Sequence, residues 1–148
     1  MRLIKMTTIH VIFPLTIGGL IYISFRSLSL RLFGWFEFTG INTFTSFIRN
    51  STYPIKNYLP SWIYFSLPDG LWVYSFSSAL LIIWGDQFSK VKYWLLIPLL
   101  FGVIIEFAQG LKIFPGTFDI IDFTFTIMAL ALSIIIIKPK TQTNEREN

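Results

Sequence analysis

The chain has 148 residues, of which 53% are hydrophobic, 18% aromatic and only 14% charged. Soluble domains carry about 25% charged residues, so this composition excludes an ordinary soluble domain and indicates a membrane protein with aromatic side chains near the bilayer surfaces. The formal net charge is +4, but the Lys and Arg residues are scattered among apolar segments, and we expect no nucleic-acid partner.

Apolar segments of about 20 residues are long enough to cross a bilayer. The sequence contains four such segments and predicts an all-α, polytopic membrane bundle. They cover about residues 6–25, 67–84, 93–111 and 118–137. The first lacks a small-residue cleavage site, which favours an uncleaved helix over a signal peptide. The second follows Ser66-Leu67-Pro68-Asp69, a pattern similar to a helix-capping box. The turn Pro115-Gly116 joins the last two segments as an antiparallel hairpin.

The connection between the first two segments is rich in Phe, Trp, Ile and Thr. We expect part of it, residues 32–48, to form a short interfacial or re-entrant segment in the first outer loop. Residues 1–140 then make a single transmembrane domain, and residues 141–148 a polar tail. His10 is the one histidine and cysteine is absent, which excludes disulfides, thiolate metal sites and multi-histidine metal sites. We interpret His10 as an interfacial or packed side chain.

Orientation follows from the distribution of Lys and Arg. Short segments at the N-terminus, between the second and third spans and after the fourth span hold most of these residues. Short, basic loops remain in the cytoplasm. The sequence therefore predicts cytoplasmic N- and C-termini and an aromatic loop on the outside, in a bacterial cytoplasmic membrane.

Four acidic residues lie near the outer ends of the predicted spans, together with one amide. They are Asp69, Glu106, Gln109, Asp119 and Asp122. Ionisable groups at such depth usually face the protein interior or a water-filled cavity, so we expect an outward-facing acidic pocket. It would suit a cationic group, a divalent cation or a polar lipid headgroup. The structural alternative is that Asp69 caps its helix, Asp119 and Asp122 stabilise a helix N-terminus, and Glu106 is neutral or pairs with Lys112, Arg26 or Arg31.

The segment Glu106-Phe107-Ala108-Gln109, the Pro115-Gly116 turn and Asp119-Ile120-Ile121-Asp122 resemble the VanZ-like family of small bacterial membrane proteins. That family has an E-x-x-Q motif, a short P-G turn, a D-x-x-D motif and an earlier Asp, which Asp69 matches. The resemblance implies a bundle of four to five helices. It also implies a link to glycopeptide resistance of the teicoplanin class or to envelope maintenance.

The leading hypothesis is therefore a non-enzymatic envelope protein without a cofactor, whose partners are the bilayer and a polar lipid, cell-wall precursor or cationic ligand. One alternative is a membrane enzyme acting on a lipid or cell-wall precursor, with Mg²⁺ or Mn²⁺ held by Glu106, Asp119 and Asp122, because carboxylates suit these ions. The other is an accessory subunit that binds a membrane protein partner in a larger complex.

Overall fold

The computed structural model describes residues 2–28, 31–84, 88–113 and 119–137, and within these ranges it contains helices and no strand. Four of the described helical stretches are long and apolar enough to cross a membrane. They are Leu3–Phe25, Ser61–Ile83, Lys90–Gly110 and Ile120–Ile137. The predicted all-α class and the four candidate spans are thus confirmed. The polar tail, residues 141–148, lies outside the described residues.

The first candidate span is continuous but changes its helical pitch. It consists of α1 (Arg2–Thr7), a π-helical turn η1 (Thr8–Ile12) and α2 (Phe13–Phe25). Pro14 has no N–H to donate to the carbonyl of His10, and this gap in the α-helical bonding favours the wider turn. His10 lies on this turn, with Nδ1 2.8 Å from the hydroxyl of Tyr74.

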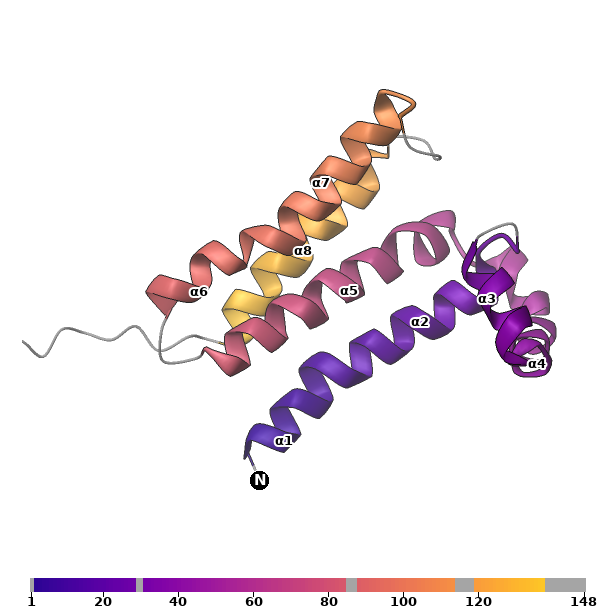
Figure 1. The fold of residues 1–148 in the computed structure, drawn as a ribbon, viewed down its shortest axis with the longest axis horizontal. Coiled ribbons are helices and arrows are strands. Elements are labelled where there is room, and N and C mark those ends of the chain that lie inside the picture. The colour runs from indigo at the N-terminus through magenta and orange to yellow at the C-terminus, as the bar shows by residue number, and fades with distance from the viewer. Residues whose placement is uncertain (1, 29–30, 85–87, 114–118, 138–148) are drawn as a thin grey trace, which may run out of the picture.

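The second candidate span, α5 (Ser61–Ile83), is the central helix and packs against α2 on one side and α8 on the other (Figure 1). It begins after Pro60, several residues before the start near residue 67 that the sequence predicts. The predicted start is wrong because Pro68 lies inside the helix and does not end it. Neighbouring helices pack around Pro68, which is buried, and such packing makes a proline tolerable within a membrane helix.

The last two candidate spans form the predicted antiparallel pair. α6 (Phe88–Trp94) leads into α7 (Leu96–Gly110), and α8 (Ile120–Ile137) returns beside it (Figure 1). α8 packs closely on α5, and both helices bury small or hydroxylated residues. Among them are Gly70, Ser77, Ser78, Thr126, Ala129 and Ser133. α7 packs mainly on α8 and makes fewer contacts with α5, so a space remains between α5 and α7.

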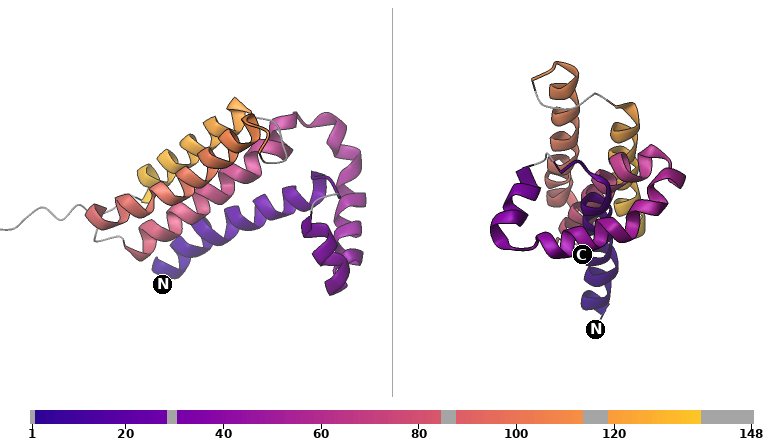
Figure 2. Two further views of the ribbon diagram at one scale, coloured as in Figure 1. Left: turned by 45° about the horizontal axis from the view of Figure 1, so that its top comes forward. Right: turned by 90° about the vertical axis from the view of Figure 1, so that its right-hand side faces the viewer.

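Two short helices, α3 (Arg31–Thr39) and α4 (Asn42–Thr52), and the 3-10 turn η2 (Tyr53–Tyr58) connect α2 to α5. They lie across one end of the bundle (Figure 2). With 9 and 11 residues, α3 and α4 reach about 14 and 17 Å, which is about half the thickness of a bilayer core. Arg49 joins α4 to the bundle because its Nη1 donates to the carbonyls of Ile23, at 2.8 Å, and Arg26, at 2.9 Å.

The buried apolar cluster lies at the opposite end of the bundle, where α5 and α8 end and α6 leads into α7. Its members are Leu80, Leu81, Val91, Leu95 and Ile137. The bundle is therefore closed by apolar packing at this end. The space between α5 and α7 extends along α7 from Ile97, close to this cluster, to Gln109, near the end where α3 and α4 are found.

Candidate functional site

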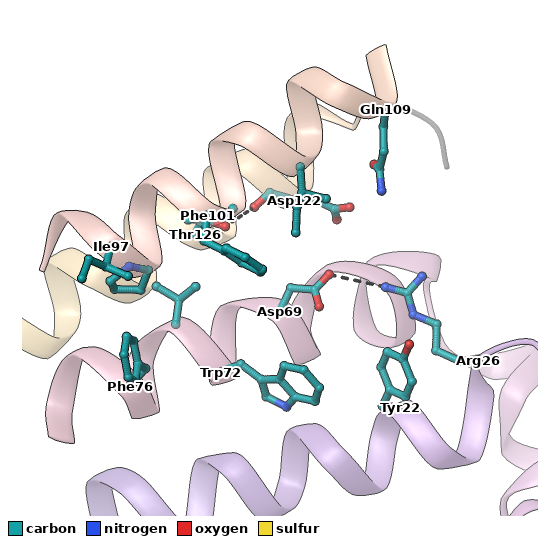
Figure 3. A pocket seen from close by; sticks show the side chains of 14 residues that line it. Tyr22, Arg26, Asp69, Trp72, Phe76, Ile97, Phe101, Gln109, Asp122 and Thr126 are labelled. Atoms are coloured by element: carbon teal, nitrogen blue, oxygen red, sulfur yellow. Dashed lines mark hydrogen bonds and ion pairs between the residues drawn. The ribbon is translucent and has the colours of Figure 1, made fainter. Parts of the chain in front are cut away.

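A cavity of about 600 Å³ lies between α2, α5, α7 and α8 (Figure 3). Polar side chains gather at the end of the cavity where α2 ends and α8 begins, and apolar side chains line the remainder. The charged or amide residues of the lining are Arg26, Asp69, Gln109 and Asp122. The large apolar residues of the lining include Trp72, Phe76, Ile97 and Phe101.

Arg26 follows directly after α2 and reaches across to α5. One of its Nη atoms lies 3.4 Å from Oδ2 of Asp69 and donates to the carbonyl oxygen of Phe65 at 3.2 Å. Its guanidinium also stacks over the rings of Tyr22 and Phe65, at 5.4 and 5.3 Å from their centres. These contacts hold the guanidinium at the polar end of the cavity and bring a positive charge to the Asp69 carboxylate.

Asp69 does not cap its helix. The capping interpretation is wrong because α5 begins at Ser61 and Asp69 lies in its third turn. From this position the carboxylate points into the cavity and toward Arg26 (Figure 3).

Asp122 lies in the first turn of α8 and lines the cavity. Its carboxyl points into the same space as that of Asp69 (Figure 3). Oδ1 of Asp122 is enclosed by protein and has no hydrogen-bond partner among the residues that the structure describes. Thr126, one turn further on, donates to the backbone carbonyl of Asp122 at 3.0 Å and not to its carboxyl group. Asp122 therefore brings to the cavity a carboxyl with one oxygen that lacks a hydrogen-bond donor among the described residues.

The other predicted site residues differ in their positions. Gln109, in the last turn of α7, lines the cavity. Asp119 does not line it; its Oδ1 accepts a hydrogen bond of 2.8 Å from the backbone N–H of Ile121, as an N-cap residue does. Glu106 belongs to α7, but its side chain lies outside the described part of the structure. The structure thus brings together Asp69, Gln109 and Asp122.

Several cavity residues escaped the sequence interpretation, although helical spacing points to some of them. Trp72 follows Asp69 by three residues, and Ile105 precedes Gln109 by four, so each shares a helix face with a predicted site residue. The sequence indicates Arg26 only as one of three candidate partners of Glu106. Its contact with Asp69 depends on how α2 and α5 pack, which the sequence pattern alone does not specify.

The cavity suits a cationic or hydrogen-bond-donating group better than an anion. Arg26 pairs with Asp69, and the carboxyl of Asp122 remains as the excess negative group. Among the described side chains, no group of three His, Cys, Asp or Glu residues is arranged to hold a metal ion. The predicted Mg²⁺ or Mn²⁺ set includes Glu106, whose side chain is not described, so this set stays a prediction.

Comparison with known proteins gave no relative. No protein-family model matches the sequence, and neither a curated protein nor a solved structure is significantly similar to it.

Proposed function

We propose that this chain is a VanZ-like protein of the bacterial cytoplasmic membrane, which binds a polar or cationic component of the cell envelope in an outward-facing pocket. The observation that carries the proposal is the cavity, because Asp69, Gln109 and Asp122 all line it. These residues come from three separate motifs of the family resemblance. They belong to three different helices and share one cavity, as expected of a binding site.

The proposed orientation rests on the position of the cavity relative to the basic residues. The polar end lies where α2 ends, and Lys5 and Lys92 belong to α1 and α6 at the opposite end of the bundle. Short, basic segments remain in the cytoplasm. The polar end of the cavity would then open toward the outside.

Photo-crosslinking in living cells tests the binding function. A photoreactive phenylalanine analogue replaces Phe101, which lines the cavity, or Phe107, which lies on the same helix outside the lining and has a similar exposed fraction, 63% against 69%. We expect the label at position 101 to capture one discrete envelope component and to lose it when Asp122→Asn is added. At position 107 it should capture membrane lipids in their bulk proportions. The same bulk mixture at both positions would contradict the proposal.

The proposed link to glycopeptide resistance has a separate test. Expression in a susceptible bacterium should reduce its susceptibility to an antibiotic of the teicoplanin class. Asp122→Asn should abolish this effect at equal membrane accumulation. Unchanged susceptibility with the wild-type chain would show that the resistance role is wrong, whatever the cavity binds.

We also propose that α3 and α4 lie in the interface on the outer side of the cytoplasmic membrane. The support is their position across the end of the bundle, combined with exposed aromatic side chains, among them Trp35, Phe38 and Phe47. Phe38 is 94% exposed and follows the exposed, charged Glu37. A spin label at position 38 should be relaxed more strongly by oxygen dissolved in lipid than by an aqueous nickel complex, and a label at position 37 should show the reverse. Preferential relaxation by nickel at both positions would contradict this placement.

A further inference from the structure

The cavity is amphipathic along its length, which restricts the class of molecule that it can bind. Trp72 and Phe76 are one turn apart on α5, and Ile97 and Phe101 are one turn apart on α7. Phe76 and Ile97 lie at the end of the cavity opposite Asp122 and Gln109, and Trp72 and Phe101 lie between them and the polar residues (Figure 3). A small hydrophilic molecule would leave this apolar wall without a partner. A molecule with a polar head and a hydrocarbon chain would match both parts.

The charges at the polar end of the cavity determine which head group a bound amphiphile should carry. Because Arg26 lies 3.4 Å from Asp69, the Asp122 carboxyl is the group that needs a positive partner. Its enclosed Oδ1 has no hydrogen-bond donor among the described residues. A buried carboxylate oxygen without a donor is costly, and a cation that also donates hydrogen bonds relieves the whole cost. A protonated primary amine supplies both the charge and the N–H donors. A quaternary ammonium supplies only the charge.

We infer that the cavity binds an amphiphile whose head carries a protonated primary amine. The amine would lie at Asp122, and the chain would extend along the wall of Trp72, Phe76, Ile97 and Phe101. This inference rests on the proposed binding function and names its ligand class. An ethanolamine-headed membrane lipid and a soluble long-chain amine share this chemistry.

Lipid retention by the purified full-length chain tests which head group the cavity recognises. The protein is delipidated in a neutral detergent, mixed with equal amounts of three phospholipids with identical acyl chains, and examined by native mass spectrometry. The three heads are ethanolamine, choline and glycerol, so the phosphate that Arg26 could contact is common to all. Because charge-assisted hydrogen bonds contribute about 1.5–3 kcal/mol, the ethanolamine lipid should be retained at least about tenfold more than the other two.

Two variants separate the acidic site from a general charge effect. Asp122→Asn should abolish the preference for the ethanolamine lipid, and Glu37→Gln, which removes an exposed carboxylate outside the cavity, should leave it unchanged. Val73→Trp places a larger side chain in the cavity and should reduce retention of all three lipids to a similar degree. Equal retention of the three heads by the wild type, or a preference that survives Asp122→Asn, would overturn the inference.

A competition with wild-type protein keeps the inference testable even if Asp122→Asn does not fold. Dodecylammonium should displace the bound ethanolamine lipid, and dodecanol, which has the same chain and no charge, should not. Tighter binding of dodecylammonium than of the lipid would identify a soluble long-chain amine as the natural ligand. Weaker binding of dodecylammonium would identify the membrane lipid as the natural ligand. Failure of dodecylammonium to displace the lipid would overturn recognition of the amine. If photo-crosslinking at position 101 captures a discrete component without an amine, the proposed binding function stands and this inference fails.

Discussion

Arg26 and Asp69, 43 residues apart in sequence, meet at 3.4 Å and join the end of α2 to the third turn of α5. Their side chains are 25% and 42% exposed, so water partly screens the pair. We expect Asp69→Asn to cost about 1 kcal/mol of unfolding free energy or less.

Arg26→Gln should cost more, about 2 kcal/mol, because it also removes the hydrogen bond to Phe65 and the stacking on Tyr22. Thermal unfolding of the purified variants in detergent measures both changes. Their double mutant should be less destabilised than the sum of the single changes. Additive effects would show that the pair is not coupled, and a larger loss for Asp69→Asn would contradict the predicted order of the two single changes.

Gly18 provides a matched test of how α2 packs on α5. A Cβ atom at Gly18 would lie 3.0 Å from two atoms of the Trp72 indole and 3.3 Å from the Pro68 carbonyl oxygen, whereas none lies within 4 Å of a Cβ at Gly19. Gly18→Ala should destabilise the protein by about 1 kcal/mol or more and displace Trp72 from the cavity wall. Gly19→Ala should be neutral or stabilising, because alanine favours helix. Equal melting temperatures for the two variants would contradict the close approach.

Arg49 links α4 to the end of α2. It donates to two carbonyls at the end of α2 and lies 5.4 Å from the centre of the Phe33 ring. Arg49→Gln should cost about 1.5–3 kcal/mol and increase amide hydrogen exchange in α4. Lys56→Gln removes a neighbouring exposed cation and is the control. Unchanged exchange in α4 of the Arg49 variant would mean that other contacts hold this helix in place.

The predicted topology is testable because the natural chain lacks cysteine. Ser51→Cys, on α4, should react with a membrane-impermeant maleimide added to intact cells. Thr143→Cys, in the polar tail, should react only after the membrane is permeabilised. Labelling of both positions in intact cells would contradict a bundle with four spans.

The number of candidate spans was predictable because each apolar run is close to the length that a bilayer requires. The start of α5 was not, since Pro68 is a helix-ending signal when only the sequence is considered. Its burial between helices reverses that expectation. The length of an apolar run can be counted in the sequence. The effect of Pro68 on the helix depends on the residues that pack around it in the folded bundle.

The candidate site was predictable only in part, for a related reason. α5 and α8 are apolar on most sides, so their sequences do not specify which face turns inward. Spacing could place Gln109 and Asp122 at the same end of a hairpin. It could not show that Asp119 binds a backbone N–H while Asp122 lines the cavity. The contact of Arg26 with Asp69 likewise depends on helix rotation, which is a property of the packed bundle.

The proposed acidic cavity opens to the outside of the cell, and the reactivity of single cysteines measures both its access and its charge. Ile105→Cys places a thiol in the cavity lining; Ile104→Cys places one at nearly the same depth of α7, on an exposed face outside the lining. Impermeant thiosulfonates with a trimethylammonium or a sulfonate group are added to intact cells, and the reaction rates are compared. The cysteine at position 105 should react from outside, faster with the cationic reagent, and Asp122→Asn should abolish this preference. Equal rates for the two reagents, or equal reactivity at positions 104 and 105, would contradict an outward-facing acidic cavity.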